Sequence, residues 1–158
     1  MIEYFVMDVD GTLTDGKLYM GNQGEVMKAF DIKDGCGIHE ILPELGILPV
    51  IITGRTSEIV SNRCKELRIP YYFQGVSDKL SKLVEITGDM KHLSRVAYIG
   101  DDRNDLRCMR AVRKQGGLVG CPADAIREVV EVSDFVSEFK GGAGAVRDFI
   151  EYICKTIP

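Results

Sequence analysis

Two aspartates separated by one residue follow an apolar run near the start of the chain. Asp8 and Asp10 come after residues 2–7, which are mostly apolar, and Gly11 follows them. A run of this kind predicts a buried strand, and open α/β sheets bind ligands beyond the carboxyl ends of their strands. Neighbouring carboxylates repel each other, so a hard divalent cation such as Mg²⁺, which prefers oxygen ligands, would stabilise the pair. The alternative is an ordinary turn, in which Asp and Gly are common.

Small polar groups follow a second apolar run. Thr53 and Gly54 come directly after residues 48–52. The Thr53 hydroxyl and the Gly54 amide can hold phosphate oxygens, because N–H groups at the start of a helix favour anions. Alternatively, Thr53 only ends a strand and Ser57 caps the helix that follows.

Lys79 stands at the start of a predicted helix. A cation at this end opposes the helix dipole, which prefers negative charge there. A functional role would explain the exception, because Lys79 could bridge Asp8 and a transferring phosphoryl group and stabilise charge in the transition state. The alternative is a solvated surface lysine.

A third apolar run, residues 96–99, also ends in acids. Asp101, Asp102 and Asp105 follow Gly100. An aspartate here can cap the helix predicted to begin near residue 104, which accounts for one acid but hardly for all three. Together, the polar groups at these strand ends and helix starts predict one reactive site.

Composition and charge are those of an ordinary globular domain. The 158 residues are 45% hydrophobic and 28% charged with a net charge of −4, which fits one domain, residues 1–158, and disfavours nucleic-acid binding. No apolar run approaches about 18 residues, and the first residues lack the basic start of a signal peptide, so we expect no membrane segment and a cytoplasmic location. The five cysteines include no Cys-x-x-Cys pair, which favours reduced thiols.

Strands and helices are predicted to alternate along the chain. Apolar runs predict strands at 2–7, 48–53, 71–73, 96–99, 118–119 and 135–136. The segments between them have helical spacing of apolar residues. This order predicts an α/β fold, a doubly wound and mostly parallel sheet of Rossmann-like type.

Two segments depart from this alternation. Residues 16–31 have the pattern of a β-hairpin with Gly and Asn in its loop, and residues 140–158 form a C-terminal tail that begins rich in glycine. An isolated hairpin is only marginally stable, and this one carries many apolar side chains. We therefore expect it to pack on another subunit.

The four polar segments, in their order, resemble the four motifs of the haloacid dehalogenase superfamily. Further stretches resemble a subfamily of small, capless, tetrameric phosphatases that act on phosphates of 3-deoxy-ulosonic acids. These stretches include Leu18-Tyr-Met-Gly-Asn, Lys28-Ala-Phe, Lys33-Asp-Gly, Phe73-Gln-Gly and Gly141-Gly-x-Gly-Ala-Val-Arg147. The resemblance covers nearly the whole chain and implies the superfamily fold with the hairpin in place of a cap domain.

The resemblance also implies catalytic roles for the polar residues. Asp8 would attack phosphorus to give an aspartyl-phosphate, and Asp10 would protonate the leaving oxygen and then activate water. Thr53 and Lys79 would hold the phosphoryl group. Mg²⁺ would be bound by Asp8, the Asp10 carbonyl and Asp101, with Asp102 and Asp105 as secondary acids near the metal.

The substrate implied by the resemblance is 3-deoxy-D-manno-octulosonate 8-phosphate, hydrolysed to the free sugar acid and phosphate. Arginine binds carboxylates through two hydrogen bonds, and positions 55 and 63 are predicted to fall roughly on one helix face. The alternative for Arg63 is a solvent-exposed charge on the helix, which is common for arginine. His39 replaces an arginine that contacts substrate in some relatives. The implied substrate contacts are Asp10, Asp31, Ile32, Lys33, Asp34, Gly35, His39, Gly54, Arg55, Arg63 and Lys79.

A homotetramer is also implied, with active sites at subunit interfaces and the glycine-rich tail reaching a neighbouring site.

Two other functions stay open at this point. Phosphatases of sialic-acid-type 9-phosphates share the scaffold but usually have Glu after the glycine of the second motif, where this chain has Arg55. A regulatory or oligomerisation module, like the related domains fused to sugar-nucleotide synthetases, would not need Asp8, Asp10, Lys79 and Asp101. We therefore favour a Mg²⁺-dependent phosphatase of the octulosonate type.

Overall fold

A parallel sheet of six strands forms the centre of the molecule. The computed structural model describes residues 1–156. Every neighbouring pair of strands in this sheet is parallel. The order across the sheet is β5 (Tyr71–Phe73), β4 (Leu48–Ile52), β1 (Tyr4–Met7), β6 (Val96–Ile99), β7 (Leu118–Cys121) and β8 (Phe135–Val136). The predicted doubly wound α/β fold is confirmed, and the predicted strands lie within two residues of the observed ends.

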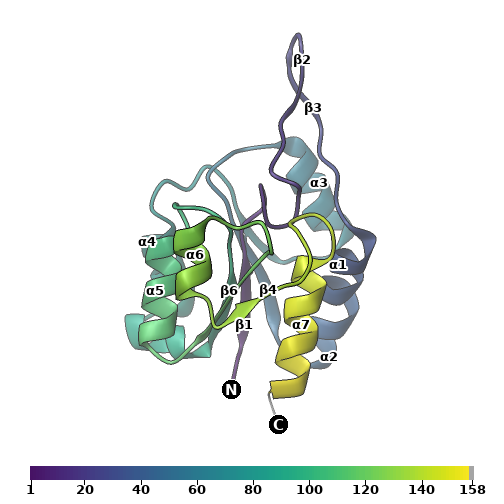
Figure 1. Cartoon of the computed structure of the whole chain (residues 1–158). Helices are drawn as coiled ribbons and strands as arrows, with labels where there is room; N and C mark the ends of the chain where they lie inside the picture. Colours follow the sequence, from purple (N-terminus) through teal and green to yellow (C-terminus); the bar gives the residue numbers. More distant parts are fainter. Residues whose placement is uncertain (157–158) are drawn as a thin grey trace.

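Helices cover both faces of the sheet (Figure 1). One layer holds α1 (Ile32–Cys36), the π-helix η1 (Gly37–Ile41), α2 (Leu42–Glu44), α3 (Glu58–Glu66) and α7 (Ala145–Thr156). The other holds α4 (Lys79–Thr87), the 3₁₀-helix η2 (Met90–Arg95), α5 (Leu106–Lys114) and α6 (Arg127–Val132). Within residues 1–156, no helix is both long enough and apolar enough to cross a membrane.

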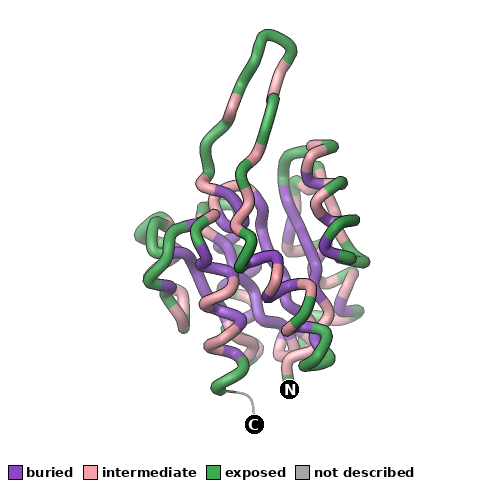
Figure 2. The backbone as a smooth tube through the Cα atoms, turned by 90° about the vertical axis from the view of Figure 1, so that its right-hand side faces the viewer, coloured by how far each residue is buried: buried purple, intermediate pink, exposed green. Residues whose placement is uncertain are grey.

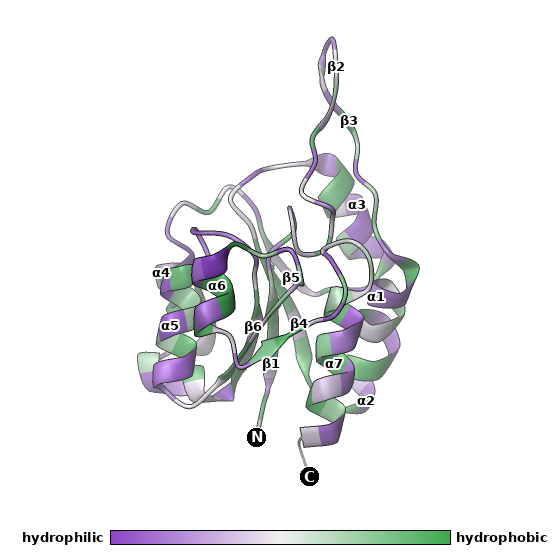
Figure 3. Ribbon diagram, in the orientation of Figure 1, coloured by the Kyte–Doolittle hydropathy of each residue, from purple (hydrophilic) through white to green (hydrophobic). Residues whose placement is uncertain are grey.

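The two helical layers bury two separate cores. Alternate residues of a strand point to opposite faces, so Phe5 and Met7 pack in the core beneath α7, while Val6 packs beneath α5. The central strands are predominantly hydrophobic, as parallel strands covered on both faces must be (Figure 3). This burial fixes the positions at which the strands end, and therefore the site that follows.

The predicted hairpin is present and projects from the body of the molecule. Strands β2 (Tyr19–Gly21) and β3 (Gly24–Met27) pair in an antiparallel arrangement. Most of its residues are exposed (Figure 2). The large apolar side chains exposed on it are Leu18, Met20, Val26 and Met27.

A buried aspartate joins α1 to α7. Asp34 is 1% exposed, and its Oδ1 accepts a hydrogen bond of 2.8 Å from the Arg147 amide. The first amides of a helix lack partners within the helix, so this bond satisfies one of them. Burial raises the pKa of the Asp34 carboxyl to about 6.

We expect Asp34 to make stability fall as pH rises from about 4 to 6. Because the pKa of Asp34 is raised from 3.8 to about 6 in the folded chain, the folded state holds this proton more tightly than the unfolded state. Relative to Asp34→Asn, the free energy of unfolding of the wild type should fall by on the order of 2–3 kcal/mol between pH 4 and pH 7. Urea denaturation at several pH values measures this, and the same pH dependence in both proteins would contradict it.

Candidate active site

The carboxyl ends of three neighbouring strands meet around a hollow of about 350 Å³. Strand β1 lies between β4 and β6, and Met7 is level with Ile51 and Ile99. The residues that follow these strands therefore share one edge of the sheet. The hollow is lined by Asp8, Asp10, Thr53, Gly54, Arg55, Asp102, Arg103 and Asn104.

Lys79 is buried beside two of the acids. Its side chain is 2% exposed, and its Nζ lies 2.9 Å from Asp8 Oδ2 and 2.9 Å from Asp105 Oδ1. Burial by itself would lower the pKa of Lys79, but the charges of Asp105 and Asp8 outweigh it and the pKa is raised. Lys79 is therefore a fixed cation at the start of α4, and the alternative of a solvated surface lysine is wrong.

Three carboxylates form a compact acidic group. Oxygens of Asp8, Asp101 and Asp105 all lie within 4.8 Å of one another. Burial, together with repulsion from Asp105, raises the pKa of Asp8 to about 7. The same causes raise the pKa of Asp101 to about 8. A divalent cation with oxygen ligands fits this set, because it would replace the protons that these pKa values otherwise favour.

The packing around the acidic group requires a glycine at position 11. Gly11 has a φ of +89°, and a Cβ on it would lie 2.0 Å from Asp101 Oδ2. The Thr12 hydroxyl donates a hydrogen bond of 2.9 Å to Asp101 Oδ1. The turn that follows β1 therefore holds Asp101, which follows the neighbouring strand β6, in place.

Asp102 and Asp105 differ more than the sequence indicates. Asp105 is 0% exposed and accepts hydrogen bonds from the Tyr98 hydroxyl at 2.7 Å and the Asp101 amide at 3.1 Å. Asp102 is exposed, and its carboxylate accepts a hydrogen bond from the Arg103 amide. Asp105 therefore belongs to the acidic group, while Asp102 lies at the wall of the hollow.

Asp10 has different neighbours from Asp8. Its Oδ1 lies 2.5 Å from Lys28 Nζ, and its Oδ2 lies 4.0 Å from Arg55 Nε. Its carboxylate is outside the acidic group, so a role for Asp10 in binding metal would fall to its backbone carbonyl, as the family resemblance implies. The sequence alone assigns no role to Lys28. Its one indication of function is that it begins Lys28-Ala-Phe, a stretch that resembles the phosphatase subfamily.

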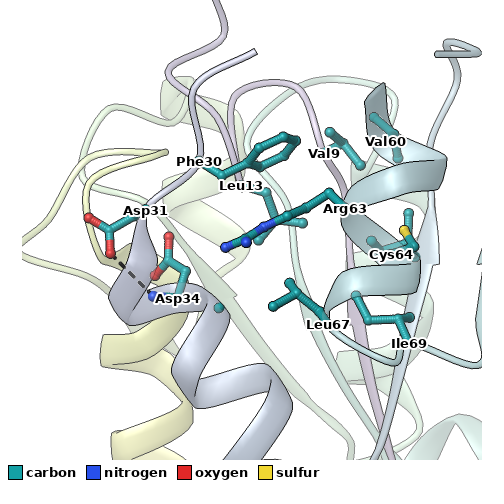
Figure 4. A pocket seen from close by; sticks show the side chains of 12 residues that line it. Val9, Leu13, Phe30, Asp31, Asp34, Val60, Arg63, Cys64, Leu67 and Ile69 are labelled. Carbon is teal, nitrogen blue, oxygen red and sulfur yellow. Dashed lines mark hydrogen bonds between the residues drawn. The ribbon is translucent and has the colours of Figure 1, made fainter. Parts of the chain in front are cut away.

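The expected substrate residues do not all lie in one place. Gly54 and Arg55 line the hollow with Asp8. Asp31, Asp34, Gly35 and Arg63 instead line a smaller pocket of about 10 Å³, room for roughly one water. Figure 4 shows the Arg63 side chain reaching across this pocket toward the part of α1 that carries Asp34. The arginine stacks over Phe30, 5.5 Å from the ring centroid.

The other expected contacts lie away from Asp8 within the subunit. Ile32 and Lys33 are exposed on α1, and His39 lines a separate hollow with Arg63 and Glu66. One subunit therefore does not bring His39, Arg63 or the residues 31–35 into the hollow that contains Asp8. Their contact with substrate stays a prediction.

The glycine-rich segment lies against the turn that follows β1. A Cβ on Gly141 would meet the Gly11 carbonyl oxygen at 2.0 Å, and one on Gly142 would meet the Asp15 amide nitrogen at 2.7 Å. These glycines thus allow close packing within their own subunit. Of the predicted tail, residues 145–156 form α7, and residues 157–158 lie outside the described residues. Contact of the tail with a neighbouring site stays a prediction.

Known phosphatases resemble this chain closely in sequence and structure. No protein-family model matches it. The 3-deoxy-D-manno-octulosonate 8-phosphate phosphatase KdsC of Yersinia pestis is 40% identical over 153 residues, 96% of this chain and 79% of that protein. A crystal structure of 3-deoxy-D-manno-octulosonate 8-phosphate phosphatase from Moraxella catarrhalis, with magnesium, phosphate and KDO, has a TM-score of 0.88 and 41% identity, covering 98% of this chain and 86% of that one. The cobalt-bound Haemophilus influenzae phosphatase has a TM-score of 0.87 and 34% identity, covering 98% and 88%.

We expect Asp101→Asn, but not Asp102→Asn, to remove the response of stability to a divalent cation. Magnesium at about 100 times its Kd should raise the Tm of the wild type by roughly 5–10 °C. Asp101→Asn should abolish most of this rise, because it removes one carboxylate of the acidic group. Thermal denaturation with EDTA and with Mg²⁺ measures the effect.

The neighbouring Asp102→Asn is the matched control, because Asp102 is exposed and outside the acidic group. It should keep most of the rise. An equal loss in both variants, or no rise in the wild type, would contradict this assignment of the metal site.

Proposed function

Because this chain belongs to the 3-deoxy-D-manno-octulosonate 8-phosphate phosphatase family of the haloacid dehalogenase superfamily, we propose that it hydrolyses this sugar acid phosphate with the help of Mg²⁺. One observation carries the proposal. Asp8 lies at the end of β1, 2.9 Å from the buried Lys79 and within the group of three carboxylates. A fixed cation and a metal site beside one carboxylate are what nucleophilic attack on phosphorus requires.

The first step transfers the phosphoryl group to Asp8. A carboxylate oxygen of Asp8 forms a bond to phosphorus while the bond from phosphorus to the sugar oxygen breaks. Asp10 gives a proton to that oxygen, which leaves as a hydroxyl. The Val9 amide donates a hydrogen bond of 2.7 Å to Asp8 Oδ1, so the nucleophile is held in one orientation.

The second step frees the enzyme. Asp10 takes a proton from a water molecule, whose oxygen attacks phosphorus, and the bond from phosphorus to Asp8 breaks to release phosphate. Lys79 and the polar groups of Thr53 and Gly54 bind phosphoryl oxygens and stabilise their charge. Bound at the acidic group, Mg²⁺ would neutralise further charge on the phosphoryl group.

The sugar acid is bound, in this proposal, where the hollow opens. Arg55 has a side chain 49% exposed at the rim and can bind a carboxylate through two hydrogen bonds. Arg63, His39 and the residues 31–35 lie outside this hollow in one subunit. Their proposed contact with substrate therefore requires sites that lie between subunits.

We expect 3-deoxy-D-manno-octulosonate 8-phosphate to be the best substrate. Its kcat/KM should exceed that of ordinary hexose phosphates by at least about 100-fold, since a missing charged contact typically costs that much. A panel that includes 9-phosphates of sialic-type acids measures this. Equal activity on hexose phosphates would overturn the sugar acid assignment, and preference for a 9-phosphate would favour the sialic-type alternative.

The control for this panel is Asp8→Asn, which should lower turnover of every ester to background while the Tm stays near that of the wild type. The amide keeps the size of the side chain but is a poor nucleophile. Phosphatase activity retained by this variant would contradict the role of Asp8. Absence of Mg²⁺-dependent activity in the wild type would favour the regulatory module.

We propose a homotetramer in which the hairpin packs on a second copy of the chain. Val26 and Met20 are 63% and 59% exposed on a hairpin that projects from the body (Figures 1 and 2). An apolar surface of this kind is typical of protein interfaces.

Sedimentation equilibrium at micromolar concentration should show a tetramer, and Met20→Lys with Val26→Lys should shift it to smaller species, because charges would enter an apolar interface. Lys17→Met, a change at an exposed position of the same insertion, is the control and should leave the tetramer unchanged. A monomeric wild type would contradict the assembly.

We also propose that the protein acts in the cytoplasm. All five cysteines are free, and Cys64 and Cys108 are buried in the cores. Free buried thiols suit a reducing compartment.

A further inference from the structure

The exposed hairpin ends in a buried charge. The Lys28 side chain, just after β3, is 1% exposed, whereas Val26 and Met27 before it are exposed. Burying an ammonium group costs several kcal/mol unless it is paired. A lysine at the base of a surface hairpin therefore needs a specific reason to be buried.

Lys28 contacts two carboxylates and no other acid on the described chain. Its Nζ lies 2.5 Å from Asp10 Oδ1 and 2.9 Å from Glu25 Oε2. Burial would lower the pKa of Lys28, but these two hydrogen bonds outweigh it and the pKa is raised. The lysine is thus held as a cation between the hairpin and the turn that follows β1.

Glu25 is in turn fixed by the segment after β4. Its Oε1 accepts a hydrogen bond of 3.1 Å from the Ser57 hydroxyl, and its Oε2 lies 3.9 Å from Arg55. These contacts connect the hairpin to the wall of the hollow. Arg55 is the other cation near Asp10, and its Nε lies 4.0 Å from Asp10 Oδ2. Lys28 is therefore the closer of the two cations.

We propose that Lys28 is a positioning residue that orients the carboxylate of Asp10 for proton transfer, with Glu25 holding Lys28 in place. This inference rests on the proposed phosphatase function and extends it to the hairpin. Lys28 is not among the residues that line the hollow and contacts none of the three carboxylates of the acidic group, so Asp10 is the one proposed catalytic residue that it contacts directly. A change in the base of the hairpin therefore changes proton transfer more than it changes substrate binding.

The leaving group separates this role from a purely structural one. The sugar oxygen is a strongly basic leaving group and needs the proton of Asp10, whereas p-nitrophenolate leaves readily without it. Lys28→Met should therefore lower kcat/KM for the sugar acid 8-phosphate by about 30- to 100-fold and for p-nitrophenyl phosphate by less than about fivefold. The KM for the sugar acid phosphate should change by less than about twofold.

Three companion variants sharpen the test. Lys28→Arg keeps the cation and should recover most of the lost activity. Lys17→Met, on the exposed part of the same insertion, should leave both rates unchanged. Asp10→Asn combined with Lys28→Met should be no slower than Asp10→Asn alone, because a residue that acts through Asp10 has nothing to orient once that carboxylate is gone.

The outcomes separate the inference from the proposed function. If the wild type hydrolyses neither ester, the proposed function fails. If the wild type is active but Lys28→Met loses equal activity on both esters, or the double variant is much slower than Asp10→Asn, the positioning role is overturned. Should Lys28→Met fail to fold by circular dichroism, Lys28→Gln is measured in its place under the same criteria.

Discussion

The ammonium group of Lys79, buried between Asp8 and Asp105, is the interaction on which the site depends. Asp8, Asp101 and Asp105 bring three carboxylates into one group, and Lys79 supplies one positive charge to it. With all three carboxylates ionised, the group would carry more negative charge than Lys79 neutralises. Burial strengthens this repulsion, as the raised pKa of Asp101, about 8, indicates. The same excess that makes the site costly without a cation gives it affinity for a divalent metal ion.

The parallel sheet explains how residues so far apart in sequence reach this group. All six strands point the same way, so the residues after β1, β4 and β6 gather at one edge. Tyr98, inside β6, contacts the group because its hydroxyl donates a hydrogen bond to Asp105. Close packing completes the edge, because Gly11 lies against Asp101 and Gly141 lies against Gly11. Substituting either glycine would move the turn that carries Asp10.

The sequence predicts those features that depend on local pattern. Apolar runs mark the strands, and the acids that follow them mark the edge, so Asp8, Thr53 and Asp101 were placed correctly relative to the sheet. Features that depend on contacts between distant segments were not predictable. The burial of Lys28 depends on how the hairpin folds back onto Asp10, and the difference between Asp102 and Asp105 depends on the turn before α5. The prediction that Arg55 and Arg63 share one helix face is wrong, because Arg55 precedes α3 (Glu58–Glu66) and Arg63 packs on Phe30 in a different pocket.

The outer part and the base of the hairpin have different properties. Its outer part exposes apolar side chains that suit a second subunit, and its base carries Glu25 and Lys28 into the wall of the site. A two-stranded hairpin alone is only marginally stable, so its position relative to the body depends on what holds each end. The buried pairing of Lys28 with Asp10 fixes the inner end, and packing of a second copy would fix the outer end. In the proposed tetramer, assembly of the subunits and orientation of Asp10 would therefore be linked through one short insertion.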